Sequence, residues 1–176
     1  MTKAHKTNLL RNFATITFSV CFFVCFTGSA QNVVAWGSNT QGQINVPASA
    51  TNVVAVAAGW YQSLALRNDG TVIAWGAISS VPNGATNVVG IAAGVSNNLA
   101  LKADGTVLCW GDNSWGQTNV PVFQTNVVSI AAGNFHNLAL MADSTVVAWG
   151  KNANGQTSVP TGLALIHKVQ VLDHRL

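Results

Sequence analysis

The sequence contains no glutamate and little charge of either sign. Its five acidic residues are all aspartates, and eight lysines and arginines give a net charge of +3 over 176 residues. Three of those basic residues, Lys3, Lys6 and Arg11, account for the whole excess. The rest of the chain is neutral and lacks the basic surface that binding to a phosphate backbone requires. We therefore predict that no nucleic acid is a partner.

The chain is also poor in the side chains that carry out catalysis. Acid–base hydrolysis needs paired carboxylates, or a nucleophile beside an oriented base. Three of the aspartates, Asp69, Asp104 and Asp143, occupy the same turn of a repeated unit, and His136 is the only histidine inside those units. A residue at a repeated position favours a structural role. We predict no enzymatic activity, no cofactor and no metal site.

Cysteine is scarce as well. Cys21 and Cys25 lie in an apolar leader, so a processed chain would retain Cys109 alone and could form no internal disulfide. Cys109 occupies a position that holds alanine in the other units. We interpret it as a small buried apolar residue.

The first thirty residues have the pattern of a secretory signal peptide. A basic start is followed by an apolar run from Phe13 to Phe26 and by the small residues Gly28, Ser29 and Ala30. We predict cleavage before Gln31 and an extracellular or periplasmic location, without stable insertion in a membrane. The alternative is an uncleaved anchor, but polar residues interrupt the run and leave it short for a membrane span.

Repetition is what the sequence has in abundance. The phrase Val33-Val34-Ala35-Trp36-Gly37 recurs with tryptophans at 75, 110 and 149, which are 39, 35 and 39 residues apart. Asn-Val-Val, Ala-Ala-Gly, Leu-Ala-Leu and Asp-Gly accompany it in a constant order. A period of this length indicates a ring or stack of small units. We assign residues 31–160 to the repeats, as a partial unit at 33–47 and full units at 52–82, 87–121 and 126–160.

Each unit is predicted to form short strands joined by turns, and no segment of the repeats has helical spacing. Asp-Gly between two apolar runs indicates a hairpin, because glycine accepts the positive φ of the turn. Ser144 replaces that glycine in the last unit. A left-handed serine would cost on the order of 1 kcal/mol.

The predicted strands are apolar on both faces. In the strand around Trp75, Val72 and Ala74 face one way, and Ile73 and Trp75 face the other. Such a sheet needs cover on both sides, which the blades of a β-propeller provide for one another. The sequence therefore predicts an all-β protein made of propeller blades.

About three and a half repeats are too few to close a ring, since propellers typically have four to eight blades. We predict an incomplete ring with an open blade edge through which copies of the chain self-associate. The tail at 161–176 departs from the repeat, and we interpret it as the truncated or frame-shifted end of a longer protein. Alternatively, residues 168–172 add one edge strand.

The ordered phrases resemble those of the regulator-of-chromosome-condensation repeat family, whose members form seven-bladed propellers. The resemblance covers residues 33–160. Gly-Gln running into Thr-x-Val-Pro at 116–121 is similar to a bacterial, secreted branch that includes a β-lactamase-inhibitory propeller. The chain departs from the family pattern at 77–82, where Gly-Gln is missing, and in having only His136 as the family's histidine before Leu-Ala-Leu. The matching residues in one unit are Gly59, Leu64, Leu66, Asp69, Gly70, Trp75 and Gly76.

The turn after Ala-Ala-Gly differs between units, and rigid exposed aromatics are typical anchors for protein contacts. It reads Trp60-Tyr61, Val95-Ser96 and Asn134-Phe135. The alternative is that these rings cap the blade core. The asparagines after Trp-Gly are predicted to form turns: Asn39, Asn113 and Asn152. Our protein-binding candidates are Trp60, Tyr61, Asn134, Phe135 and Trp115, with Phe123 as a secondary one.

We predict a secreted scaffold that binds a protein partner through the rim loops of its blades. The resemblance implies a second hypothesis, an inhibitor of a secreted hydrolase. A third is a non-functional fragment of a longer propeller protein. The nucleotide-exchange role of eukaryotic family members is disfavoured by the leader and by the neutral repeats.

Overall fold

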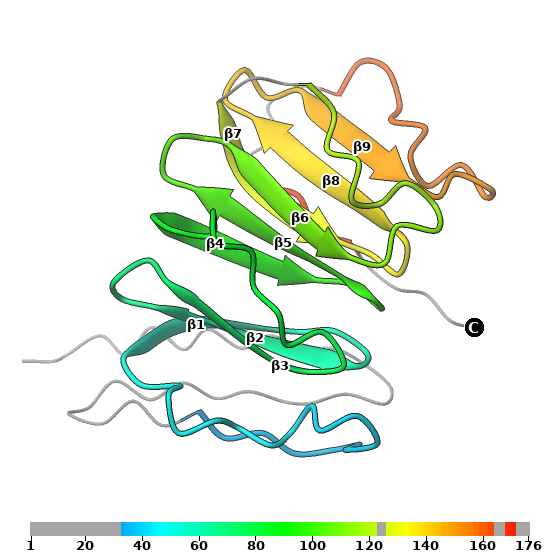
Figure 1. Cartoon of the computed structure of the whole chain (residues 1–176). Coiled ribbons are helices and arrows are strands. Elements are labelled where there is room, and N and C mark those ends of the chain that lie inside the picture. The colour runs from blue at the N-terminus through cyan, green and yellow to red at the C-terminus, as the bar shows by residue number, and fades with distance from the viewer. Residues whose placement is uncertain (1–32, 123–125, 164–167, 172–176) are drawn as a thin grey trace, which may run out of the picture.

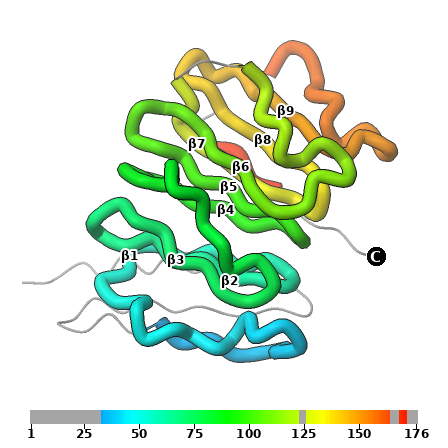
Figure 2. Tube along the Cα trace, in the orientation of Figure 1, coloured from blue at the N-terminus to red at the C-terminus, as the bar shows by residue number. Residues whose placement is uncertain are grey.

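A computed structural model describes residues 33–122, 126–163 and 168–171. Within them, nine strands form three antiparallel sheets of three strands each, in simple meander order. Figures 1 and 2 show the three sheets stacked in chain order, with residues 33–47 beneath the first. Blade 1 holds β1 (Val53–Ala58), β2 (Gln62–Arg67) and β3 (Val72–Gly76), blade 2 holds β4 (Val88–Ala93), β5 (Asn97–Lys102) and β6 (Val107–Gly111), and blade 3 holds β7 (Val127–Ala132), β8 (His136–Met141) and β9 (Val146–Gly150).

The predicted signal peptide and Phe123 lie outside the described residues. Among the described residues, no helix has the length and the apolar character needed to cross a membrane. The all-β prediction is confirmed, and the three stacked sheets agree with the predicted propeller blades.

Each blade begins with the same irregularity. The pairing of its first two strands shifts register between Val53 and Ala55 in blade 1, and at the equivalent residues of blades 2 and 3. The asparagine before each of these strands has a positive φ, 53° at Asn52, which asparagine tolerates better than most residues. The second valine of each first strand stays exposed as a result: Val54, Val89 and Val128.

The apolar cores lie between successive layers, as two-sided strands require. Val72 and Ala74 of β3 face the core shared with blade 2. Ile73 and Trp75 face the core shared with residues 33–47. The predicted alternation is therefore confirmed. Burial of one large apolar side chain contributes about 1.5–3 kcal/mol, so these cores hold the blades together.

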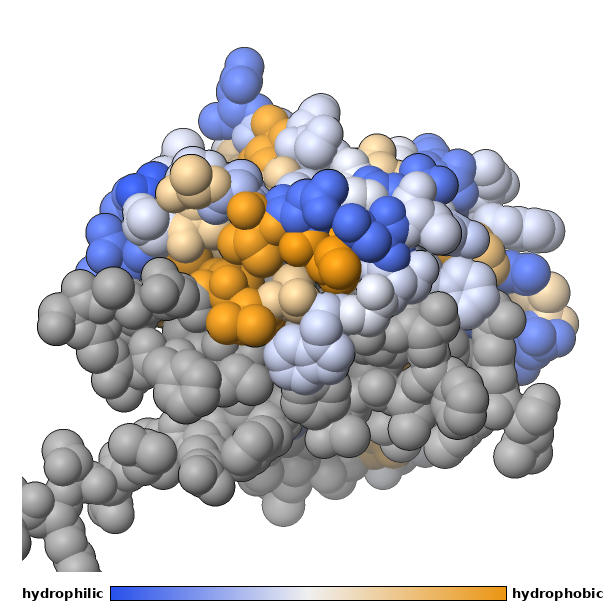
Figure 3. Space-filling model, turned by 90° about the horizontal axis from the view of Figure 1, so that it is seen from below, coloured by the Kyte–Doolittle hydropathy of each residue, from blue (hydrophilic) through white to orange (hydrophobic). Residues whose placement is uncertain are grey.

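The opening segment differs from the expected strand. Only Val34 of residues 33–37 makes a β-bridge, although the segment packs on blade 1. The described residues offer this segment no Leu-Ala-Leu strand of its own unit to pair with. Trp36 is accordingly 44 % exposed, whereas the equivalent Trp75, Trp110 and Trp149 are 5–9 % exposed. Figure 3 views the molecule from this end and shows apolar side chains at the surface.

The tail contacts the last blade without forming a strand in its described part. Val169 is buried against Ala131 and Leu140, and Val171 packs beside it. Residues 168–171 are not assigned to a sheet, so the alternative of an added edge strand is not seen there. These two valines instead cover part of the outer face of blade 3.

Candidate functional site

The predicted binding residues gather at one end of the blades. The turns between the first and second strands lie there, next to the residues that leave each third strand. The amides of Ala77, Asp112 and Lys151 donate to the carbonyls of the neighbouring turn, each at 2.8 Å. We call this end the aromatic rim. It comprises residues 59–61, 94–96 and 133–135 and the loops that begin at residues 77, 112 and 151.

Glycine allows the turns of adjacent blades to approach one another. A Cβ atom on Gly59 would lie 2.2 Å from the carbonyl oxygen of Gly94, and one on Gly94 would lie 2.3 Å from that of Gly133. The amide of Trp60 donates to Gly94 at 3.4 Å, and that of Val95 donates to the carbonyl of Asn134 at 3.3 Å. The rim is therefore a continuous backbone network across three blades, which the Ala-Ala-Gly phrase makes possible.

Buried amide side chains continue this network below the rim. The Nδ2 of Asn97 donates to the Oδ1 of Asn137 at 2.8 Å, and the Nδ2 of Asn137 donates to the carbonyl of Gln117 at 2.7 Å. In blade 1, the Nε2 of Gln62 donates to the carbonyl of Gly94 at 3.1 Å. Gln62, Asn97 and Asn137 are all fully buried. Buried hydrogen bonds between blades hold the rim residues of one blade in a fixed relation to those of the next.

Trp60 and Tyr61 form an aromatic pair on blade 1. Their ring centroids are 5.9 Å apart with an interplanar angle of 76°, an edge-to-face arrangement. Tyr61 is exposed, and Trp60 is half-buried with its carbonyl accepting from the Nε2 of Gln43 at 3.3 Å. This pair presents a rigid aromatic edge to solvent.

Trp115 and Phe135 come from different blades and meet at one cation. The Nζ of Lys151 lies 4.3 Å from the ring centroid of Trp115 and 5.4 Å from that of Phe135. Trp115 belongs to the loop after β6, Phe135 to the turn before β8, and Lys151 directly follows β9. Trp115 is 50 % exposed, and the other two side chains are half-buried. We call these three residues the lysine–aromatic cluster.

The loop that carries Trp115 is held rigidly. The main-chain amide of Trp115 donates to the Oε1 of Gln117 at 2.8 Å. The Nε2 of Gln117, which is buried, donates to the Oδ2 of Asp112, also at 2.8 Å. The Oδ1 of Asn113 accepts from the amide of Thr118 at 2.9 Å. Asn39 and Asn152 make the equivalent bond in their loops, so the predicted turn role of these asparagines is confirmed.

The structure places four of the five predicted residues in two groups. Trp60 and Tyr61 contact each other on blade 1, and Trp115 and Phe135 share Lys151 at blades 2 and 3. Asn134 accepts from blade 2 through its carbonyl and so connects blades. Sequence reasoning missed Lys151. Its position directly after Trp-Gly, at which the other units carry serine, alanine or aspartate, was the available signal.

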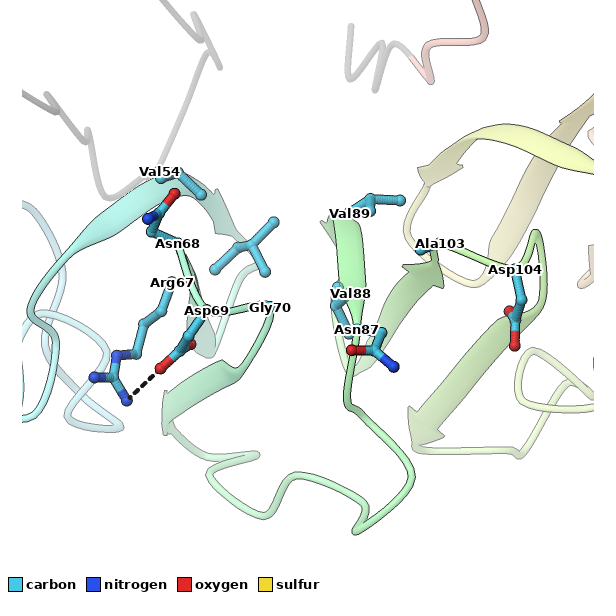
Figure 4. A pocket seen from close by; sticks show the side chains of 11 residues that line it. Val54, Arg67, Asn68, Asp69, Gly70, Asn87, Val88, Val89, Ala103 and Asp104 are labelled. Atoms are coloured by element: carbon cyan, nitrogen blue, oxygen red, sulfur yellow. Dashed lines mark ion pairs between the residues drawn. The ribbon is translucent and has the colours of Figure 1, made fainter.

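The opposite rim holds a cleft of about 710 Å³ between blades 1 and 2. Figure 4 shows Arg67 turned toward Asp69 on one side, with Asn87 and Val89 on the other. The Oδ1 of Asp69 accepts from the amide and the hydroxyl of Thr71, which lowers the pKa of that carboxyl below its ordinary 3.8. An ionised carboxylate occupied in its own turn is unsuited to act as a general acid.

Cys109 occupies the position predicted for it. Its thiol packs in the core between blades 2 and 3 and donates to the carbonyl of Gln117 at 3.2 Å. Burial raises the pKa of the thiol to about 12. Cys109 is therefore a neutral thiol at physiological pH and a poor nucleophile.

Comparison with known proteins agrees with this fold. The model for the regulator of chromosome condensation (RCC1) repeat matches residues 53–78, 88–117 and 127–156. Each match contains the three strands of one blade. A search of curated protein sequences finds no match to this chain. The comparisons do not confirm the expected closeness to the secreted, β-lactamase-inhibitory branch.

Several solved structures share the fold. The ectodomain of the receptor kinase CR4 from Physcomitrella patens is 25 % identical with a TM-score of 0.70, over 81 % of this chain and 42 % of that one. Prp20p from Saccharomyces cerevisiae, reported with its binding properties to Gsp1p and histones, is 23 % identical with a TM-score of 0.67, over 82 % and 45 %. Human WBSCR16 is 22 % identical with a TM-score of 0.55, over 74 % and 45 %. The chain spans less than half the length of each.

Proposed function

We propose that this chain of RCC1-type repeats is a secreted scaffold. It binds a protein partner at its aromatic rim and catalyses no reaction. The observation that carries this proposal is the position of the exposed rings. Tyr61 is 38 % exposed and Trp115 is 50 % exposed, and both stand on a hydrogen-bonded backbone. Large aromatics on a rigid support contribute binding area at little entropic cost.

The alternative role, capping of the blade cores, has less support. The cores of the described residues are filled by other side chains, and Trp60, Tyr61, Trp115 and Phe135 belong to none of them. Each ring instead contacts a rim neighbour. Loss of these rings should therefore reduce binding more than it reduces stability.

A selection with displayed peptides tests the proposal. Short random peptides are panned against the immobilised chain, and the enriched peptides are then tested on two double variants. Trp60→Ala with Tyr61→Ala and Trp115→Ala with Phe135→Ala should each lower retention about tenfold or more, as hot-spot rings do. The control, Val54→Ala with Val89→Ala, alters exposed apolar residues beside the opposite rim and should leave retention unchanged. Equal retention by all folded variants would contradict the proposal.

A second candidate function is inhibition of a secreted hydrolase. It rests on the sequence of residues 116–121, the Gly-Gln loop that runs into Thr-x-Val-Pro. The exposed Trp115 directly precedes this segment in the same loop, and its ring is suited to enter an enzyme cleft. Titration of a panel of β-lactamases with the purified chain tests this candidate. Stoichiometric loss of activity would support it, and full activity at excess chain would contradict it.

The exposed face of residues 33–47, which we call the opening face, favours self-association as a further property. Val34 is 51 % exposed and Trp36 is 44 % exposed on the layer that begins the stack. An apolar layer of this kind is covered by a neighbouring blade in a closed propeller. We propose that a second copy of the chain covers it.

A further inference from the structure

We infer that the partner segment that meets the lysine–aromatic cluster carries a carboxylate side chain, which pairs with Lys151 next to an apolar side chain on Trp115. This inference rests on the proposed function, because it concerns the chemistry of the partner at the same rim. It follows from the charge state of the blades, from the direction of Lys151 and from the exposure of Trp115.

Lys151 differs from the other cations of the blades. Arg67 pairs with Asp69 at 3.5 Å, and Lys102 pairs with Asp104 at 3.3 Å. Among the described residues, Lys151 takes part in no such pair and contacts aromatic rings instead. The rim thus holds a cation whose charge no carboxylate of the described chain neutralises.

The nearest acidic residue in sequence to Trp115 is already engaged. The Oδ1 of Asp112 accepts from the hydroxyl of Ser114 at 2.6 Å, and its Oδ2 accepts from Gln117 at 2.8 Å. These hydrogen bonds hold the carboxylate inside its own loop, and that of Ser114 does most to lower the pKa of Asp112. No carboxylate among the described residues therefore pairs with Lys151, and its charge is available to an acceptor on a partner.

The cluster also fixes the direction of the ammonium group. The two ring faces hold Nζ at 4.3 and 5.4 Å, and such contacts contribute about 0.5–1 kcal/mol at exposed sites. The rings supply no oxygen or nitrogen acceptor, so an N–H of the ammonium that points away from both faces remains for an oxygen. A half-buried, oriented cation loses less side-chain entropy on pairing than a mobile surface lysine does.

Trp115 supplies the second part of the recognition. Half of its surface is exposed beside the charge, on a loop that the buried Gln117 holds in place. An acidic side chain adjacent to an aromatic or aliphatic one would satisfy both features at once. A phosphate with a stacked base would satisfy them too, but the neutral remainder of the chain offers no track for a nucleic-acid backbone.

The test uses the peptides selected on the wild-type chain. We expect them to be enriched in Asp and Glu relative to the unselected library, most often next to an apolar residue. Lys151→Gln should weaken their binding about tenfold, and Lys102→Gln, which removes a cation of the opposite rim, should not change it. Raising the salt from about 50 to 500 mM should weaken binding to the wild-type chain more than binding to Lys151→Gln. Circular dichroism confirms that each variant is folded.

Three results would overturn the inference. Peptides whose binding depends on Trp115 but that show no acidic enrichment would agree with the rim scaffold and would exclude recognition of a carboxylate. Acidic peptides that bind Lys151→Gln as well as the wild-type chain would do the same. Binding of single-stranded oligothymidine that requires both Trp115 and Lys151 would replace the acidic peptide with a nucleic acid. If no selected peptide depends on any rim residue, the proposed function itself fails.

Discussion

The indole Nε1 of Trp149 donates a hydrogen bond of 3.0 Å to the main-chain carbonyl of Gln117. This bond ties blade 3 to the loop that leaves blade 2. Trp75 makes the same bond to Gln43 at 2.8 Å, across an equal separation of 32 residues. Trp110 has no Gly-Gln loop before it. With the Asn98 amide oriented to suit its neighbours, the oxygen of that amide accepts from Trp110 at 3.3 Å instead.

Trp149→Phe should destabilise the chain by about 2–3 kcal/mol. The change removes a buried hydrogen bond and leaves a gap where the larger indole ring packed. Denaturant unfolding followed by circular dichroism measures the effect. Trp36→Phe is the matched control at the exposed equivalent position and should cost less than about 1 kcal/mol. Equal losses for the two variants would show that the link between blades contributes nothing specific.

Ser144→Gly should stabilise the chain by about 0.5–1 kcal/mol. Ser144 has a φ of 69° at the turn position where Gly70 and Gly105 have φ of 76° and 79°, so the predicted left-handed serine is confirmed. The reciprocal variant, Gly105→Ser, should destabilise by about 2 kcal/mol or more, because a Cβ there would lie 2.6 Å from the amide nitrogen of Asn126. Thermal unfolding of both variants checks the signs. No change in either would contradict the strain argument.

Asp104 should contribute stability that acid removes. Its pKa is lowered from 3.8 to about 2, first by the hydroxyl of Thr106, which donates to it at 2.6 Å. A carboxyl whose folded pKa lies below its unfolded value stabilises the fold above pH 3.8 and loses that contribution as the pH falls toward 2. Thr106→Val should raise the pKa of Asp104 toward 3.8 in a carboxyl NMR titration. Asp143, held in the same way by Thr145, serves as the unchanged reference in the same spectra.

Self-association should depend on Val34. If a second copy covers the opening face, sedimentation should show a dimer whose fraction increases with protein concentration. Val34→Lys would place a charge in that interface and should weaken dimerisation at least about tenfold. Val122→Lys is the control at a loop position that is 89 % exposed, and it should have no effect. A single monomeric species for all three chains at every concentration would exclude this use of the face.

Export should remove the leader. Expression of the whole chain in a bacterium should yield an extracellular or periplasmic product whose first residue is Gln31. Ala30→Arg should block processing, because the peptidase requires a small residue before the cleaved bond. Intact-mass spectrometry distinguishes the two forms. A cytoplasmic product that retains Met1 would refute the predicted signal.

The blades could be predicted because strand alternation is a local property. Ile73 and Trp75 face one core and Ala74 faces the next, as a period of two residues requires. The lysine–aromatic cluster could not be predicted in the same way. Trp115, Phe135 and Lys151 converge only through the rotation of one blade on the next, which no single repeat encodes.

The ends of the stack were predicted less well for a related reason. Val169 and Val171 belong to none of the repeated phrases, so no sequence pattern predicted their packing on blade 3. Val34 has the sequence of a strand but makes only an isolated β-bridge. A repeat predicts its own interior well and its boundaries poorly, because each boundary depends on what the adjacent layer supplies.

The 32-residue separation that joins Trp75 to Gln43 and Trp149 to Gln117 has a consequence for how such a chain changes in evolution. Duplication of one period copies the indole together with the carbonyl that receives it. The inserted module would contain both partners of this hydrogen bond and would require no compensating mutation elsewhere. Duplication of one period can therefore lengthen the array, and deletion of one period can shorten it, while the remaining modules keep this bond.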